Sequence, residues 1–414
     1  MTDLRPIIIG GDIGAYACAR TFHEAYGARS VVLAGVSTGA VAHSSIIDHR
    51  IVAGLDDDDE LAAAIGAVAA ERPDCTHLVL GSADHAVQAL VRIREQLPAV
   101  IVPYAEAAAM EQVTSKAGFS QLCLELGIPH PRTQVLRIDA GQWQLPAGVA
   151  FPLVLKAASS AQFHAVEFPG KRKVAFLATM DELTQLLQRM ATAGFSGDVV
   201  LQELIPGSDE DMAAVNSFCD TSGMVRFQLF GQVLLEEATP NGLGNSVAQI
   251  TGGASAHDEA VEHARRLLAH IGWTGFANID LKRDPRDGRY RFLELNPRVG
   301  RSGYAVTCAG YNTALMYGHF YAGQPSPPWQ GEHEESALYV GENEHLFTVV
   351  PLALLHRYVS AGMWRRVRGL RRRAATNPYY YAAERNPRRW LYIAMAMFNQ
   401  FRKFRRWHEP SGRG

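Results

Sequence analysis

The stretch that decides the fold covers residues 275–301 and reads GFANIDLKRDPRDGRYRFLELNPRVGR. Residues 284–288 (DPRDG) are a strong turn signal between two runs of alternating residues, which predicts a β-hairpin. Since successive strand residues point to opposite faces, the hairpin divides into two sets. One predicted face carries Asn278, Asp280, Lys282, Phe292, Glu294 and Asn296, and the other carries Ala277, Ile279, Leu281, Leu293 and Leu295.

The polar face of this hairpin offers two carboxylates and an amide oxygen. We expect Asp280 to lie opposite or diagonal to Glu294, within reach of a shared ion, with Asn296 nearby. Oxygen ligands without Cys or His suit Mg²⁺, which keeps waters and substrate phosphates as its other ligands. Taken alone, the pattern also fits a solvated hairpin face with ordinary polar residues.

Two other segments carry binding signals, the first for an anion and the second for a purine and a ribose. Lys156 ends an apolar strand, where its ammonium loses hydration unless an anion meets it, and the small residues Ser159 and Ser160 allow close backbone approach. A lysine extending from a sheet edge explains this segment equally well. Residues 199–212 form a strand that breaks into an acidic turn, which fits either a purine and ribose site or an acidic surface loop.

The rest of the chain divides into an α/β part and an α+β part. Residues 7–34 read as a strand, a turn, a helix and a second strand (31–34), and residues 76–96 read as a strand, a turn and a helix, which indicates a parallel sheet covered on both faces. The glycine turn at 10–14 lacks the acid expected about 20 residues after a dinucleotide fingerprint, so we expect it to line another small-ligand site. Later strands are expected at 153–156, 199–203, 213–219, 276–283 and 289–296, with helices near 180–193 and 257–271.

Composition excludes several classes of protein. A chain of 414 residues with 47% hydrophobic and 20% charged residues is a folded globular protein of about two or three domains. The net charge of -2 argues against a surface built for nucleic acid. Five scattered cysteines predict neither a disulfide framework nor a zinc site and fit a reducing cytosol. We expect no signal peptide and no membrane-spanning segment.

Basic charge is concentrated near the end of the chain. Residues 357–408 hold 14 Lys and Arg residues and a single acid, Glu384, interleaved with aromatic residues. Such a segment can pack over a site and attract a phosphate-bearing substrate, or lie on an anionic membrane as an amphipathic helix. A solvated helical face with aromatic core positions explains it as well.

The order of these motifs resembles that of the ATP-grasp ligases. It runs through Lys116, residues 127–131 (GIPHP), Lys156, Gln202 and Glu203, Asp280, and the Glu294-x-Asn296 pair. Further stretches are similar to the D-aspartate ligases of peptidoglycan cross-bridge synthesis, namely 22–27, 205–207, 235–240, 244–245, 275–278, 284–288, 300–302 and 388–391. The resemblance covers nearly the whole chain.

The resemblance implies an α/β plus α+β architecture in three parts. A small doubly wound parallel-sheet domain spans residues 1–110, and an ATP-grasp domain of two lobes with ATP between them spans 111–330. A basic, aromatic-rich helical segment spans 331–414.

The resemblance also implies a role for each matching residue. The implied ligands are Lys116, Lys156, Ser159 and Ser160 for the phosphates, Gln202, Glu203 and Ile205 for adenine, Asp209 or Glu210 for ribose, and Asp280, Glu294 and Asn296 for two Mg²⁺, which Mn²⁺ can replace. Asp211 adjoins the ribose candidates and leaves that assignment open. The catalytic candidates are Arg298 and Arg301, whose charge-assisted contacts suit developing oxyanions, and Lys282. D-alanine ligases place an arginine two residues before the first metal aspartate, where this chain has Asn278.

The implied reaction is amide formation. The implied location is the cytoplasm, with the inner face of the membrane as an open alternative within it. A carboxylate attacks the γ-phosphate of ATP, and an amine then displaces phosphate from the acyl phosphate. The implied substrates are D-aspartate, through its β-carboxylate, and the lysine amine of a phosphate-bearing cell-wall pentapeptide precursor. Two alternatives stay open, an ATP-grasp ligase that acts on another amino acid or peptide in secondary metabolism and a non-catalytic nucleotide-binding or membrane-surface module. The oligomeric state is undetermined.

Overall fold

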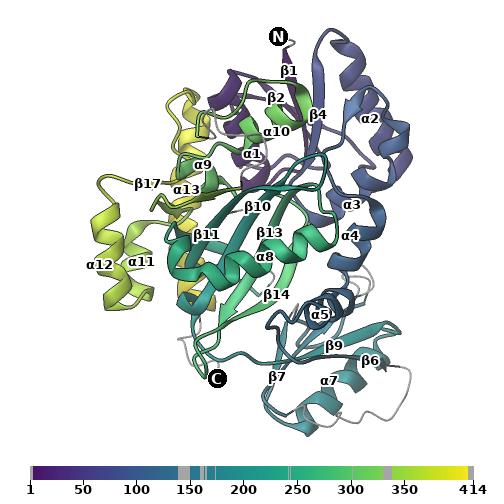
Figure 1. Ribbon diagram of the computed structural model, residues 1–414, viewed down its shortest axis with the longest axis vertical. Helices are drawn as coiled ribbons and strands as arrows, with labels where there is room; N and C mark the ends of the chain where they lie inside the picture. The colour runs from purple at the N-terminus through teal and green to yellow at the C-terminus, as the bar shows by residue number, and fades with distance from the viewer. Residues whose placement is uncertain are drawn as a thin grey trace.

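The computed structural model describes residues 3–138, 150–158, 163, 166–172, 174–240, 242, 244–300, 302–329 and 338–408. These residues form a five-stranded, a four-stranded and an eight-stranded sheet. Figure 1 shows the large sheet in the middle, with the N-terminal domain at one end and a small lobe at the other.

The N-terminal domain is the predicted parallel α/β unit. Its elements are β1 (Leu4–Ile9), α1 (Ile13–Tyr26), β2 (Ser30–Ala34), β3 (Ile47–Ile51), α2 (Asp58–Glu71), β4 (Thr76–Gly81), α3 (Asp84–Arg92), β5 (Val100–Ile101) and α4 (Ala107–Thr114). The strand order is β3-β2-β1-β4-β5, so the chain changes direction across the sheet between β1 and β4. The turns after these two strands nearly touch, because a Cβ on Gly10 would lie 2.0 Å from the Ser82 Oγ. Crevices at such switch points are where ligands bind in this fold class.

The small lobe follows helix α5 (Lys116–Glu125). Its elements are β6 (Thr133–Arg137), β7 (Leu153–Ala157), β8 (Ala175–Leu177), α7 (Met180–Thr192) and β9 (Asp198–Glu203). The antiparallel sheet has the order β6-β9-β7-β8. The lobe has a hydrophobic core of its own, in which Leu153, Leu187 and Val199 are fully buried.

The large sheet shares its core with the N-terminal domain. Its elements are β10 (Met212–Cys219), β11 (Val225–Glu236), β12 (Ser246–Thr251), α8 (Asp258–His270), β13 (Gly275–Arg283), β14 (Tyr290–Asn296), α9 (Tyr304–Cys308), α10 (Thr313–Ala322), β15 (Tyr339–Gly341), β16 (Leu346–Thr348) and β17 (Ala375–Thr376). Phe218 and Trp273 belong to the same cluster of buried residues as Ile7 and Leu80. The N-terminal domain and the large sheet are therefore packed as one body, whereas the small lobe has a separate core.

The decisive hairpin is formed by β13 and β14, as predicted, but one pair of side chains faces the other way. Asp280 pairs with Glu294, and a bulge between Asp280 and Leu281 then pairs Leu281 with Phe292. Phe292 is consequently buried in the core, and Leu293 lines a cavity. The period of two assigned these two residues to the opposite faces, and it was wrong because a bulge adds one residue to one strand.

The C-terminal part both extends the large sheet and packs helices against it. Its helices are α11 (Leu352–Tyr358), α12 (Ala361–Leu370) and α13 (Pro387–Trp407). The buried guanidinium of Arg389 pairs with Glu384 at 3.3 Å and donates to the Ala40 carbonyl at 3.0 Å. This anchors α13 on the N-terminal domain. Strands β15, β16 and β17 lie after residue 330 but belong to the large sheet, so the sheet contains residues from both sides of the predicted domain boundary at 330. That boundary stays a proposal.

Candidate active site

A cavity of about 1680 Å³ lies between the small lobe and the large sheet and reaches the β1 and β4 turns. The structure brings together in it Lys116, Lys156, Gln202, Glu203, Ile205, Asp209, Glu210, Asp280, Lys282, Glu294, Asn296 and Arg298. Ser159, Ser160 and Arg301 lie outside the described residues. The site residues predicted from distant segments therefore share one cleft wherever the structure describes them.

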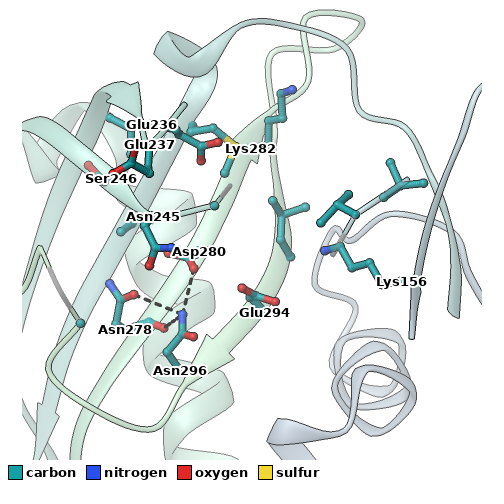
Figure 2. Close-up of a pocket in the computed structure, with 18 of the residues that line it drawn as sticks. Lys156, Glu236, Glu237, Asn245, Ser246, Asn278, Asp280, Lys282, Glu294 and Asn296 are labelled. Carbon is teal, nitrogen blue, oxygen red and sulfur yellow. Dashed lines mark hydrogen bonds between the residues drawn. The ribbon is translucent and has the colours of Figure 1, made fainter. Parts of the chain in front are cut away.

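The predicted metal ligands converge at the middle of the cleft. Asp280 and Glu294 are direct partners across β13 and β14, and the Asn296 Nδ2 donates to the Asp280 Oδ2 at 2.8 Å. Figure 2 shows the three side chains on the same wall, with Lys156 reaching toward Glu294 from the opposite wall. The spatial expectation drawn from the hairpin alternation is confirmed at these positions.

A row of asparagines orients this group. Asn216, Asn278 and Asn296 are paired in register across β10, β13 and β14. Asn278 accepts a hydrogen bond from the Asn296 Nδ2 at 3.3 Å and donates its own amide to the Asn216 Oδ1 at 3.2 Å. The amide nitrogen of Asn296 is thus held by the protein, which leaves its oxygen as the ligand atom. The alternation of the hairpin predicted Asn278 on this polar face, but its contacts with Asn216 and Asn296 were not predicted.

The electrostatics of the group favour a cation. Burial in the cleft raises the pKa of Asp280 well above its usual range, and the neighbouring Glu294 carboxylate raises it further. Two close carboxylates resist joint ionisation unless positive charge is added. No group of three or more His, Cys, Asp or Glu side chains with metal-binding geometry occurs in the described part of the chain. Two carboxylates and an amide fit Mg²⁺, because that ion takes its other ligands from water and phosphate.

The end of the cleft at which the sequence predicts adenine contacts is built around the end of β9. The Gln202 Nε2 donates to the Thr133 Oγ1 at 3.1 Å, while the Glu203 carboxylate accepts from the Arg286 Nη1 at 2.6 Å. Ile205 is buried in the segment that follows. The ammonium of Lys282 donates to the Gly207 carbonyl at 3.1 Å, so it lies toward this end of the cleft.

The three adjacent acids after this segment differ in their contacts. The Asp211 carboxylate accepts from the backbone nitrogen of Ser208 at 2.8 Å and closes a capping box, and it does not line the cavity. Asp209 accepts from the Glu236 backbone nitrogen at 3.0 Å, and Glu210 accepts from the Ser360 hydroxyl at 2.7 Å. Of the three acids considered for the predicted ribose contact, Asp209 and Glu210 line the cavity.

The N-terminal domain supplies the far end of the cleft. The Arg298 Nε lies 2.7 Å from the Asp84 Oδ1, at the start of α3. Asp12, Ser82 and Asp84, from the turns after β1 and β4, line the same cavity. The sequence predicts that the turn at 10–14 lines a small-ligand site, and Asp12 lies in the cavity wall as expected. The ion pair to Asp84 could not be foreseen, because it joins segments more than 200 residues apart.

Other cavity residues were absent from the predicted set. They include Glu236, Glu237, Asn245, Ser246, Gln249 and Ser302. Figure 2 shows Asn245 pointing toward Asp280, with Glu236 and Glu237 farther along the same wall. The buried carboxylate of Glu237 accepts from the Lys403 Nζ at 3.3 Å. The stretch 235–240 was noted as a resemblance and could have indicated these acids.

Comparisons with known proteins agree with this geometry. No protein-family model matches the chain. It is 31% identical over 316 residues to the D-aspartate ligase of Enterococcus faecium, a match that covers 75% of this chain and 74% of that protein. It is 23% identical over 237 residues to a D-alanine–D-alanine ligase of Xylella fastidiosa, covering 55% of this chain and 70% of that one.

Solved structures show the same fold. An L-amino acid ligase from Bacillus licheniformis has a TM-score of 0.57 at 15% identity, covering 77% of this chain and 74% of that one. The biotin carboxylase domain of Hydrogenobacter thermophilus 2-oxoglutarate carboxylase, solved with MgADP, has a TM-score of 0.58 at 15% identity, covering 78% of this chain and 71% of that one.

The fold and the cleft define an ATP-grasp ligase, an enzyme class that uses ATP with Mg²⁺ to form carbon–nitrogen bonds. Within that class, the chain belongs to the D-aspartate ligase family of carboxylate-amine ligases.

Proposed function

We propose that the enzyme joins the β-carboxylate of D-aspartate to the lysine side-chain amine of a phosphate-bearing cell-wall pentapeptide precursor, in the cytoplasm, releasing ADP and phosphate. The observation that carries the proposal is the convergence of Asp280, Glu294 and Asn296 opposite Lys156 in one cleft. The identity to the Enterococcus faecium enzyme supports the choice of D-aspartate.

The centre of the cleft holds the triphosphate in this proposal. Lys156 and Lys116 neutralise phosphate oxygens, and Asp280, Glu294 and Asn296 hold two Mg²⁺, which Mn²⁺ can replace. When bound, the metal offsets the repulsion between the attacking carboxylate and the γ-phosphate. The asparagine row keeps the Asn296 oxygen turned toward the ligand throughout.

The far end of the cleft holds the reacting acid. The carboxylate attacks the γ-phosphorus in line, the bond to the β-phosphate oxygen breaks, and an acyl phosphate and ADP result. Arg298, placed by its ion pair with Asp84, stabilises the transferred phosphoryl group and then the tetrahedral intermediate formed by the amine. The amine loses a proton and phosphate leaves with the former carboxylate oxygen.

The nucleotide end holds adenosine. Gln202, Glu203 and Ile205 contact adenine through their backbone and side chains, and Asp209 or Glu210 accepts from the ribose hydroxyls. Because the Lys282 ammonium is held at the Gly207 carbonyl, we assign Lys282 to this end rather than to the reacting group.

The test is phosphate release with ATP, Mg²⁺ and a panel of D- and L-amino acids, each with and without a lysine-containing pentapeptide precursor. D-aspartate together with the precursor is expected to give the highest rate. The Glu294→Gln variant is expected to lose turnover, whereas Asp287→Asn, on the exposed turn of the same hairpin, keeps it. Stimulation by another amino acid alone would favour a ligase of different specificity, and turnover unaffected by Glu294→Gln would contradict the site.

A further inference from the structure

Helix α13 has two apolar faces, and only one of them is covered by protein. Ile393, Met397 and Phe404 are buried, next to the anchoring Arg389. The opposite face leaves Leu391 62% and Phe398 66% exposed. Exposed large apolar side chains recur along this face at Trp390, Leu391, Met395, Phe398 and Phe401. Leu391, Met395, Phe398 and Phe401 follow one another at spacings of four, three and three residues, which aligns them in one stripe with Trp390 beside it, and singly scattered surface residues would not produce this pattern.

The same helix carries only positive charge. Arg388 precedes the apolar stripe, and Arg402, Arg405 and Arg406 follow it, all with exposed side chains. Residues 387–407 contain no Asp or Glu. The one acid of the basic segment, Glu384, is buried against Arg389 and cannot offset the surface charge.

We propose that this outward face of α13 docks the enzyme on an anionic lipid bilayer, with the helix lying parallel to the surface. Aromatic and aliphatic side chains then enter the interface, and the arginines at both ends of the stripe pair with lipid phosphates. None of the described helices is long and apolar enough to cross a membrane.

Charge favours a lipid surface over a second copy of this chain. Two copies that met through this face would bring arginines against arginines, with no acid on α13 to pair with them. Anionic headgroups neutralise the same arginines. The stripe and the basic residues therefore point to one kind of partner.

Docking through α13 would keep the catalytic cleft next to the bilayer. The Lys403 Nζ contacts Glu237 in the cavity wall, and His408, directly after the helix, also lines the cavity. The cleft would then open near the surface at which the helix is held. This geometry suits an enzyme whose acceptor substrate is consumed or made at the membrane, whatever acid it activates.

The test is co-sedimentation of the full chain with vesicles of phosphatidylcholine containing about 30% phosphatidylglycerol. The double variant Leu391→Glu with Phe398→Glu is expected to lower the partition coefficient at least tenfold, because it removes apolar contact and adds charge that anionic lipid repels. The control Leu124→Glu changes a residue that is 65% exposed on α5 and is expected to bind like the unchanged chain. Phosphate release in solution is expected to stay unchanged in both variants, which shows that they fold.

Three outcomes would overturn the proposal. The first is equal vesicle binding by the double variant, and the second is equal binding to pure phosphatidylcholine vesicles. The third is a dimer in sedimentation-velocity runs that the double variant abolishes while no vesicle binding is seen, which would assign the face to self-association. Higher salt is expected to weaken binding, since the arginine contacts are exposed. None of these results depends on which amino acid the ligase activates.

Discussion

The two ends of the β13–β14 hairpin carry the same kinds of side chains in opposite electrostatic states. At the cleft end, Asp280 and Glu294 face each other, and the pKa of Asp280 is raised well above its usual range by burial and by that neighbour. At the turn end, the buried Asp284 accepts from Arg286 at 2.5 Å and lies 3.1 Å from Arg291, and the Arg286 hydrogen bonds hold its pKa below the usual range.

The difference shows that the turn end of the hairpin stabilises the fold and the cleft end is arranged for binding. The turn end is neutralised by its own arginines, so it stabilises the hairpin without help. At the cleft end, ionising both Asp280 and Glu294 costs stability until a cation and a triphosphate arrive. Strain of this kind is expected where a binding site is pre-arranged for a charged ligand.

The largest expected effect is at the cleft end. Asp280→Asn removes a charged metal ligand, and we expect phosphate release to fall by about a thousandfold, in line with the several kcal/mol that a bound metal supplies to such transition states. The measurement is the initial rate with saturating ATP and Mg²⁺. The matched variant Asp287→Asn, at the exposed turn, should stay within about twofold of the unchanged enzyme. Comparable losses of phosphate release in both variants would contradict the proposed difference between the two ends.

The stability of the fold is expected to change in opposite directions when the aspartate at each end of the hairpin is replaced. Asp284→Asn leaves two arginines without their buried partner and should lower the free energy of unfolding by about 1–3 kcal/mol. This contribution is present above the ordinary pKa of aspartate and is lost as the pH falls through the lowered value. In metal-free buffer above the ordinary pKa of aspartate, Asp280→Asn should instead raise Tm, because the raised pKa of Asp280 means that its carboxyl must take up a proton or hold an unfavourable charge in the folded state. The measurement is the Tm of both variants by thermal unfolding. A lowered Tm for Asp280→Asn would contradict the claim that the Asp280–Glu294 pair destabilises the metal-free protein.

These contrasts also show what the sequence can and cannot predict. The turn signal at 284–288 and the alternation around it correctly placed Asp280 opposite Glu294. The bulge reversed Phe292 and Leu293, because a local extra residue leaves no mark in a period-two pattern. Asp84 and Glu237 reach the cleft from segments whose position depends on long-range packing. The row formed by Asn216, Asn278 and Asn296 could not be predicted either, because it depends on the register between three strands.

A smaller effect is expected in the pH dependence of magnesium binding. The metal competes with a proton for Asp280, so affinity should fall about tenfold per pH unit once the pH drops below the raised pKa of that residue. Isothermal titration with MgADP at several pH values measures this. Affinity that stays constant from neutral to mildly acidic pH would show that Asp280 is ionised without the metal and that the two ends of the hairpin do not differ.

The smallest expected effect concerns the link between the turn end and the nucleotide end. Arg286 joins Asp284 to Glu203 at the end of β9. Since Arg286 is half exposed, Arg286→Ala should raise the KM for ATP only about two- to fivefold and leave kcat nearly unchanged. Steady-state kinetics at fixed Mg²⁺ test this. A large loss of kcat would mean that the turn end takes part in the chemistry.

The central claim is tested most directly by an anomalous difference map from crystals grown with Mn²⁺ and a non-hydrolysable ATP analogue. The account predicts a strong peak within about 2.5 Å of oxygens from Asp280, Glu294 and Asn296 and of the terminal phosphates. A metal bound elsewhere in the cleft, with these three side chains making no contact to it, would contradict the account.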